Sequence, residues 1–210
     1  QTDEREPGPV MLRTLAITPA RGGSKRLPGK NLMPLNGVPL ICRSVRFALG
    51  TQLFARVIVS SDDAAILAAA RAEGADDHGL RPAELASDTA ATAQVLQYEL
   101  DRSERRWGAF DLVALLQPTT PFRRVERWQA AMRIMQDDRS VPSVIGVSAL
   151  ETHPFQAFSM SADGGLTSLF PEMLSVRSQD LPVAVRANGS LYLIRSDELR
   201  RTGQIYYPRS

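Results

Sequence analysis

The sequence predicts an α/β fold in which a mostly parallel sheet carries helices on both faces. Short apolar or β-branched runs at residues 12–18, 57–59 and 111–116 have the length and composition of buried strands. Segments with helical periodicity separate these runs, and such alternation is typical of a parallel sheet. A loop rich in Gly and Pro directly follows the first run, at the strand end where α/β folds place ligands.

The helices and remaining strands follow from local signals. Pro39 suits the first turn of a helix, where a missing N–H costs nothing, and Gly50 suits its end. Ser60 or Ser61 can cap the next helix, which Gly74 would end. The predicted helices span residues 39–49, 63–73, 89–102 and 125–136, and the two further strands span residues 143–148 and 183–194.

The alternation breaks at Glu151. From there to Leu181 the chain is irregular and is punctuated by Gly164, Gly165 and Pro171. We interpret residues 150–181 as a small excursion within a single domain that spans residues 12–210, and residues 1–11 as a disordered leader without the apolar core of a signal peptide.

Composition narrows the function classes. The 210 residues hold 25 Lys and Arg against 23 Asp and Glu, a net charge of +2, which does not favour nucleic acid as a partner. The chain has one cysteine, Cys42, so an internal disulfide is excluded and a cytoplasmic location is expected. With only His78 and His153 besides, a Cys/His metal cluster is also excluded. No apolar run reaches about 18 residues, so no membrane span is expected.

The loop after the first strand reads PARGGSKRLPGKN, from Pro19 to Asn31. Two adjacent glycines let the backbone approach a ligand closely, and successive N–H groups in such a turn can hold an anion. Its four cations, Arg21, Lys25, Arg26 and Lys30, match the charge of a triphosphate. The spacing fits neither the Walker loop nor the dinucleotide-binding GxGxxG pattern. The alternative is that this is a basic surface loop exposed to solvent. For Arg26 in particular, solvent exposure and a ligand contact are both open interpretations.

Four ordered segments then resemble one family. They are ITPARGGSKRLPGKN, RPAELASDTA, LLQPTTPFR, and RSQDLP followed by RANGSLYLI, and together they cover most of the chain from Leu15 to Ile194. The chain thus resembles the CMP-N-acylneuraminate synthetases and their legionaminic and pseudaminic acid relatives. This resemblance implies a Rossmann-like nucleotidyltransferase fold whose excursion packs against a second copy in a homodimer.

The resemblance also implies a reaction. CTP and a nine-carbon 2-keto sugar acid, a nonulosonic acid, would give the CMP-sugar and pyrophosphate, with Mg²⁺ or Mn²⁺ as cofactor. Such phosphoryl transfer depends mainly on positioning and on stabilisation of charge. The implied catalytic residues are Arg21 and Lys30. The implied nucleotide contacts are Ala20, Arg21, Gly22, Gly23, Ser24, Lys25, Lys30, Asn31, Arg81, Ser87, Asp88 and Thr89. The implied sugar contacts are Gln117, Thr119, Gln156, Arg177, Gln179, Arg186 and Asn188.

Some of these residues have simpler explanations. Ser87 or Asp88 also suits the N-cap of the predicted third helix. Asp62 and Asp63 resemble metal ligands, but a helix N-terminus explains them better. Asn188 followed by a glycine is by itself only a turn signal, and His153 is expected to be structural.

The match departs from the family in two places. The family's metal-binding acidic pair follows the last matched strand in a DIDT-like segment, and none occurs before Ser210. The metal ligands are therefore unknown, and we expect that a C-terminal part of the domain is missing. Gln156 stands where many sialic acid synthetases carry lysine, which leaves the sugar open.

Two alternatives remain. One is a cytidylyltransferase for the eight-carbon sugar Kdo, although that branch carries a QGDEP-like segment where this chain has QPTTP. The other is a nucleotide-binding homologue without catalysis, because fold alone does not guarantee function.

Overall fold

The computed structural model describes residues 12–24, 27–87 and 90–210, and the chain divides into two compact units. The first unit comprises the chain up to Ile145 together with Gly189–Ser210, and the second unit is Gly146–Asn188. The predicted excursion, residues 150–181, lies inside the second unit, whereas the predicted leader, residues 1–11, lies outside the described residues.

A five-stranded sheet in the order β4-β1-β5-β9-β6 forms the centre of the fold. Its strands are β1 (Thr14–Pro19), β4 (Arg56–Ser60), β5 (Leu112–Leu115), β6 (Ser143–Ala149) and β9 (Val185–Arg195). Strand β1 pairs in parallel with both β4 and β5, whereas β9 runs antiparallel to β5. The predicted α/β class with a mostly parallel sheet is therefore confirmed, with β9 as the exception to parallel pairing.

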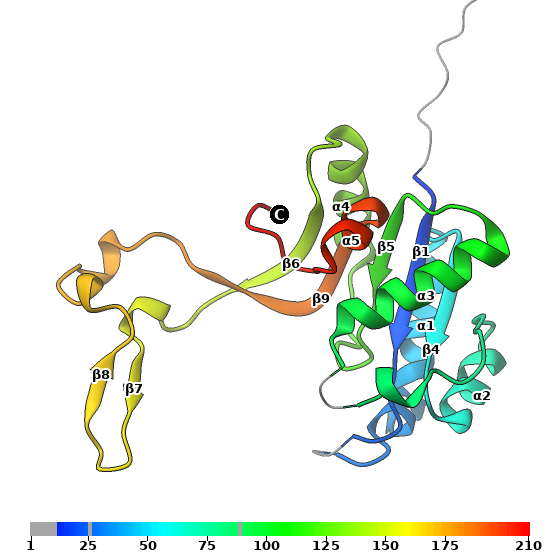
Figure 1. The fold of residues 1–210 in the computed structure, drawn as a ribbon, viewed down its shortest axis with the longest axis horizontal. Helices are drawn as coiled ribbons and strands as arrows, with labels where there is room; N and C mark the ends of the chain where they lie inside the picture. The colour runs from blue at the N-terminus through cyan, green and yellow to red at the C-terminus, as the bar shows by residue number, and fades with distance from the viewer. Residues whose placement is uncertain (1–11, 25–26, 88–89) are drawn as a thin grey trace, which may run out of the picture. The chain divides into compact units, whose positions relative to one another are not determined.

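Helices cover both faces of this sheet. They are α1 (Leu40–Thr51), α2 (Ala64–Ala72), α3 (Thr92–Trp107), α4 (Val125–Asp137) and α5 (Ser196–Thr202). Side chains alternate along β1, so Ile17 packs in one cluster with Leu96 of α3 while Ala16 packs in another with Trp128 of α4. Figure 1 shows α3 crossing one face of β1, with α1 on the other side.

The structure moves several predicted helix boundaries. Helix α1 continues through Gly50 and ends where Gln52 adopts a left-handed conformation, at φ 55°. Helix α2 is capped by Asp63, whose side chain accepts bonds from the N–H groups of Ala65 and Ile66, so the expected Ser60 or Ser61 cap is wrong. The predicted cap at Asp63 is thus confirmed, and Gly74, at φ 96°, follows the end of α2 as predicted.

Helix α3 begins later than predicted. It starts at Thr92 and not at residue 89, and the side chain of Gln94 accepts a bond from the backbone N–H of Ala91. Ser87 therefore does not cap α3. Its hydroxyl donates to the carbonyl of Glu84, which lies in the short 3₁₀ turn η2 (Ala83–Leu85).

Two short hairpins were not predicted. Strands β2 (Pro34–Leu35) and β3 (Val38–Pro39) pair around Asn36 and Gly37, which both have positive φ. In the second unit, β7 (Phe158–Met160) pairs antiparallel with β8 (Leu166–Ser168). The second unit also contains the 3₁₀ turns η3 (Pro154–Gln156), η4 (Pro171–Met173) and η5 (Ser178–Asp180). None of the helices in residues 12–24, 27–87 and 90–210 has the length and apolar character that spanning a membrane requires.

Candidate nucleotide-binding site

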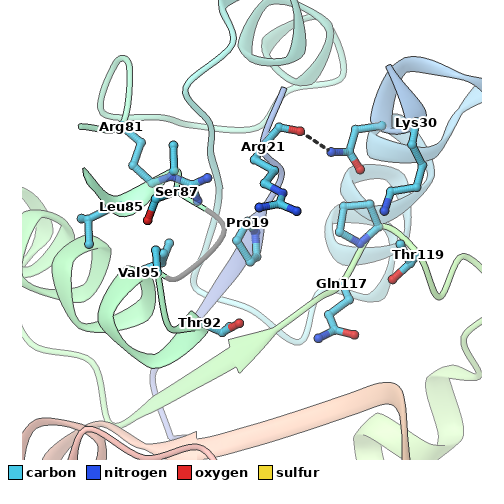
Figure 2. A pocket seen from close by; sticks show the side chains of 14 residues that line it. Pro19, Arg21, Lys30, Arg81, Leu85, Ser87, Thr92, Val95, Gln117 and Thr119 are labelled. Atoms are coloured by element: carbon cyan, nitrogen blue, oxygen red, sulfur yellow. Dashed lines mark hydrogen bonds between the residues drawn. The ribbon is translucent and has the colours of Figure 1, made fainter. Parts of the chain in front are cut away.

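A cavity of about 360 Å³ opens at the carboxyl ends of β1 and β5. Strand ends of this kind are where open α/β sheets bind ligands. The predicted site residues that line it are Arg21, Lys30, Asn31, Arg81, Ser87, Gln117 and Thr119. Figure 2 shows Arg81 and Ser87 on one side of this cavity, Lys30, Gln117 and Thr119 on the other, and Arg21 between them. Residues from three separate segments, the loop after β1, residues 81–87 and the turn after β5, thus meet in one place.

The first segment is the loop that leaves β1. The carbonyl of Arg21 accepts a hydrogen bond from the side chain of Asn31 over 2.9 Å, the dashed line in Figure 2. Asn31 is buried, with 5% of its surface exposed. Its amide N–H is used to fasten Arg21, so its position in the site serves to hold the loop as well as to line the cavity. The loop also turns at Gly29, which has a φ of 67° and precedes the 3₁₀ turn η1 (Lys30–Leu32).

The two adjacent glycines, Gly22 and Gly23, lie in different environments. A Cβ at Gly22 would lie 2.8 Å from a carboxylate oxygen of Asp63 and 2.9 Å from its Cβ, whereas a Cβ at Gly23 would meet no described atom within 4 Å. The N–H of Gly22 donates to Asp62 over 3.0 Å. Gly22 is thus a close-packing position against the start of α2, a requirement that the sequence pattern did not reveal.

Other residues of the predicted nucleotide site either do not line the cavity or lie outside the described residues. Ala20 is buried and its N–H extends the sheet by bonding to the carbonyl of Ser60, while Ser24 is buried with its N–H bonded to the carbonyl of Gly22. Neither side chain reaches the cavity wall. Lys25, Arg26, Asp88 and Thr89 lie outside the described residues, and their predicted roles stay predictions.

Arg81 forms the buried cationic wall of the site. Its side chain is 4% exposed, and its nearest carboxylate oxygen is that of Asp62, 3.9 Å from Nη2. Burial lowers the pKa of Arg81, an effect that the charges of Asp62 and Glu99 oppose. Its Nε is buried without a hydrogen-bond acceptor among the described residues. The guanidinium is therefore incompletely satisfied at the edge of a cavity that suits an anion or a polar base.

The turn after β5 places Gln117 and Thr119. The carbonyl of Gln117 accepts bonds from the N–H of Thr120, over 3.1 Å, and from the guanidinium of Arg123. Arg123 also donates to Ser44 over 3.3 Å, and burial lowers its pKa to about 10. A buried cation thus fixes this turn onto α1, a function that the quoted motif did not assign to Arg123.

The remaining predicted sugar contacts belong to the second unit. Gln156 donates to the hydroxyl of Ser178 over 3.0 Å, and Arg177 pairs with Asp180 over 2.8 Å. Asn188 donates to Ser148 over 2.9 Å. Gln179 and Arg186 are exposed. Each of the five lies in the second unit, so the structure does not join them to the cavity lining, and their sugar roles stay predictions.

His153 is structural, as expected. Its Nδ1 accepts the N–H of Phe155 over 3.2 Å and caps η3, and its Nε2 contacts the carbonyl of Pro182 over 3.0 Å.

Among the described residues, no group of three or more His, Cys, Asp or Glu side chains could hold a metal ion. The described lining of the cavity contains cationic, amide and hydroxyl groups but no carboxylate. Because Mg²⁺ prefers carboxylate and phosphate oxygens, these lining residues do not by themselves fit a protein-held divalent cation.

Leu85, Thr92 and Val95 are among the lining residues that sequence reasoning did not assign to the site. Leu85 and Val95 give the Arg81 side of the cavity an apolar surface, and Thr92 lies at the start of α3 beside them. The apolar periodicity of α3 includes Val95, but periodicity alone assigns such a residue to the core. Leu85 lies inside the RPAELASDTA segment but was not itself assigned a contact, and nothing in the local pattern around Thr92 signalled a site.

Comparison with known proteins identifies a family that matches most of the chain. Residues 15–189 match the family described as Cytidylyltransferase. The chain is 34% identical over 198 residues to a CMP-N,N'-diacetyllegionaminic acid synthase of Legionella pneumophila, covering 93% of this chain and 83% of that protein. It is 30% identical to an N-acylneuraminate cytidylyltransferase of Escherichia coli, covering 92% of this chain but only 45% of that protein.

A solved structure shares the fold. The chain aligns with a CMP:2-keto-3-deoxy-manno-octonic acid synthetase complexed with CTP at a TM-score of 0.68 and 22% identity, covering 93% of this chain and 79% of the other. The match over residues 15–189 and the 34% identity to a curated relative show that this chain belongs to the cytidylyltransferase family.

Proposed function

We propose that this protein transfers CMP from CTP to the anomeric hydroxyl of a nine-carbon 2-keto sugar acid. The observation that carries the proposal is the convergence of Arg21 and Lys30, from the loop after β1, and of Arg81, from a separate segment, on one cavity that Gln117 and Thr119 also line. A triphosphate needs several cations at once, and a sugar acid needs polar groups at the same strand edge.

The reaction requires no covalent bond between the protein and the substrates. The anomeric oxygen attacks the α-phosphorus of CTP, the bond from that phosphorus to the bridging oxygen breaks, and pyrophosphate leaves with the bond's electron pair. The hydroxyl proton passes to solvent. Charge accumulates on the phosphoryl oxygens and on the leaving group, so fixed cations at those positions lower the barrier. In this proposal Arg21 and Lys30 supply that charge, and Arg81, Ser87 and the apolar Leu85 and Val95 receive the nucleoside.

A divalent cation, Mg²⁺ or Mn²⁺, remains part of the proposal as a partner of the triphosphate. When bound it would neutralise phosphate charge. The described lining offers this cation no carboxylate.

The test is pyrophosphate release by the whole natural chain with CTP, MgCl₂ and a panel of sugar acids. The panel holds N,N'-diacetyllegionaminic, pseudaminic and N-acetylneuraminic acids, with eight-carbon Kdo as the comparison and UTP as the nucleotide control. We expect turnover with at least one nine-carbon acid. Turnover with Kdo alone would favour the eight-carbon branch, and CTP binding without any turnover would favour a non-catalytic homologue.

The identity of the nine-carbon acid is the finer part of the proposal. The relative with 34% identity is named a legionaminic acid synthase, and the one with 30% identity is named an N-acylneuraminate cytidylyltransferase. We therefore place N,N'-diacetyllegionaminic acid first in the panel. Comparing kcat/KM across the three acids ranks them directly.

We further propose a homodimer that forms through the second unit. Its β7–β8 hairpin places Phe158, Met160 and Leu166 on one face, because Met160 and Leu166 are directly paired and Phe158 lies two residues from Met160. These side chains are 48%, 75% and 66% exposed. An isolated hairpin is marginally stable, so an apolar face of this size favours a partner that covers it. Analytical ultracentrifugation tests this, and a monomer at micromolar concentration would contradict it.

A further inference from the structure

Asp62 contacts both the loop after β1 and Arg81, although it does not itself line the cavity. It follows β4 and precedes the cap of α2, and it does not cap that helix, because Asp63 does so. One oxygen of Asp62, Oδ1, accepts the N–H of Gly22 over 3.0 Å and lies 3.9 Å from Nη2 of Arg81. A single carboxylate oxygen therefore faces both the loop that carries Arg21 and the arginine on the opposite side.

Arg81 depends on charge more than on hydrogen bonds for its position. Its backbone N–H bonds to the carbonyl of Ser61 over 2.8 Å, which fixes the main chain only. Its Nε is buried without an acceptor among the described residues, and burial lowers its pKa. Asp62 is the first of the two carboxylates whose charge opposes that effect, and Glu99 is the second.

The backbone N–H of Gly22 already donates a hydrogen bond within the protein. Backbone N–H groups of a phosphate loop commonly point at the ligand, but this one points at Asp62. A carboxylate at the edge of a triphosphate site also repels the ligand by simple Coulomb interaction. Asp62 must therefore make a favourable contribution to the site that exceeds this repulsion.

We propose that Asp62 is a positioning residue that holds the loop and Arg81 in register, so that the triphosphate side and the nucleoside side of the cavity act together. This inference rests on the proposed function, because it takes CTP as the ligand. It assigns Asp62 no contact with CTP. Its effect would pass through the N–H of Gly22 and the guanidinium of Arg81.

The experiment uses a mutant cycle with a matched control. Asp62→Asn keeps an oxygen for the N–H of Gly22 but removes the charge that faces Arg81, and Asp62→Ala removes both. Asp63→Asn is the control, since it removes the same charge one residue along while asparagine remains a good helix cap. Each is made in the natural chain, and Asp62→Asn is also combined with Arg81→Ala. The measurements are the CTP dissociation constant by calorimetry, kcat and KM, and Tm.

A positioning role and a purely electrostatic role of Asp62 predict changes of CTP affinity in opposite directions. Loss of a negative charge near the triphosphate should by itself leave CTP binding unchanged or tighten it. We expect Asp62→Asn to weaken CTP binding roughly five- to tenfold, as residues in one charge network couple to that extent. Asp63→Asn should change the CTP dissociation constant by less than about twofold. When Arg81 has already been replaced by alanine, Asp62→Asn should likewise change this constant by less than about twofold. Of the two Asp62 variants, Asp62→Ala should bind CTP more weakly.

The failures are distinguishable. If the unmodified chain does not bind CTP, the proposed function falls and this inference falls with it. If the unmodified chain binds CTP but Asp62→Asn matches Asp63→Asn, only the inference falls. An equal effect of Asp62→Asn with and without Arg81, accompanied by a lowered Tm, would reduce Asp62 to a structural residue and would also overturn the proposal.

Discussion

The cavity at the sheet edge and the second unit were both predicted to hold site residues, yet they are built in opposite ways. Around the cavity, Asn31 and Arg81 are 5% and 6% exposed. In the second unit, the side chains of Arg177 and Asp180 are 74% and 48% exposed, and Val183 is 95% exposed. Asn31 and Arg81 are thus enclosed by the first unit, although Ser87 and Thr119 of the same lining are exposed, whereas the second unit presents these residues outward.

This difference separates two kinds of function. A cavity whose side chains are already fixed can bind and orient a ligand without reorganisation. An exposed segment with apolar residues is suited to being covered by something else. Changes at the cavity should therefore alter binding and chemistry without altering assembly, and changes on the hairpin of the second unit should do the reverse.

The largest effect is expected from Arg21→Ala and Lys30→Ala. Removing one preorganised charge from a developing anion typically costs about 100- to 1000-fold in rate. We expect losses of that order in kcat/KM for each, measured by pyrophosphate release, with no change in oligomeric state. Arg133→Ala, which removes an exposed arginine of α4, serves as the control. A loss of less than about fivefold at both positions would break the assignment of the cavity as the site of transfer.

The two loop glycines sharpen the comparison further. Gly22→Ala would drive a methyl group to 2.8 Å from a carboxylate oxygen of Asp63, so the loop or the start of α2 must shift. Overpacking of this kind costs about 1–3 kcal/mol. A methyl group at Gly23 would meet nothing within 4 Å in the part of the chain that the structure describes, so Gly23→Ala should be nearly neutral for folding. Thermal unfolding with CTP titration would show the contrast, and equal effects of the two substitutions would contradict the packing described here.

The sheet and its helices could be predicted because their signals are local. The runs at 12–18 and 111–116 are apolar enough to be buried strands in any context, and both are strands in the structure. Residues that a motif named, such as Arg21 and Gln117, line the cavity, while their nucleotide and sugar roles stay predictions. Asp62 was noted for its position before a helix, but its bond to Gly22 joins residues 40 apart, and no local pattern reports such a contact.

Irregular backbone was the harder part. The β7–β8 hairpin carries Asp163 followed by Gly164, with Gly164 at φ 87°, and this dipeptide is a hairpin signal. It was interpreted only as punctuation, because the flanking three-residue strands are too short to show alternation. Helix α5 was missed because its seven residues provide only about two turns of periodicity.

The hairpin face gives the next prediction. Met160→Ser combined with Leu166→Ser removes two exposed apolar side chains that are paired across the hairpin. We expect the dimer dissociation constant to rise by about tenfold or more, as central apolar contacts dominate interfaces. Tm of the first unit should stay constant. Ile134→Ser on α4, where the side chain is 48% exposed, is the matched control. Sedimentation velocity measures both, and an unchanged dimer in the double variant would remove this face as the interface.

The smallest effect is expected at Glu99, a carboxyl group of α3 that is 2% exposed and accepts the hydroxyl of Ser60 over 2.7 Å. Burial raises the pKa of Glu99 above its ordinary 4.5, although the bond from Ser60 and the charges of Arg102 and Arg81 oppose this. The folded state then holds this proton to higher pH than the unfolded state does. Its contribution to stability is complete below about pH 4.5 and declines as pH rises through the folded pKa.

Glu99→Gln keeps an oxygen for Ser60 but cannot ionise. Relative to the unmodified protein, it should therefore gain stability as pH rises from about 4 to 7, by roughly 1 kcal/mol for each unit by which the pKa is raised. Urea unfolding at several pH values measures this. Glu151→Gln, at an exposed position of the second unit, should show no such trend. If Glu99→Gln instead loses relative stability with rising pH, the cations around Glu99 outweigh its burial. In that case the cavity would owe its rigidity to a charged network more than to packing.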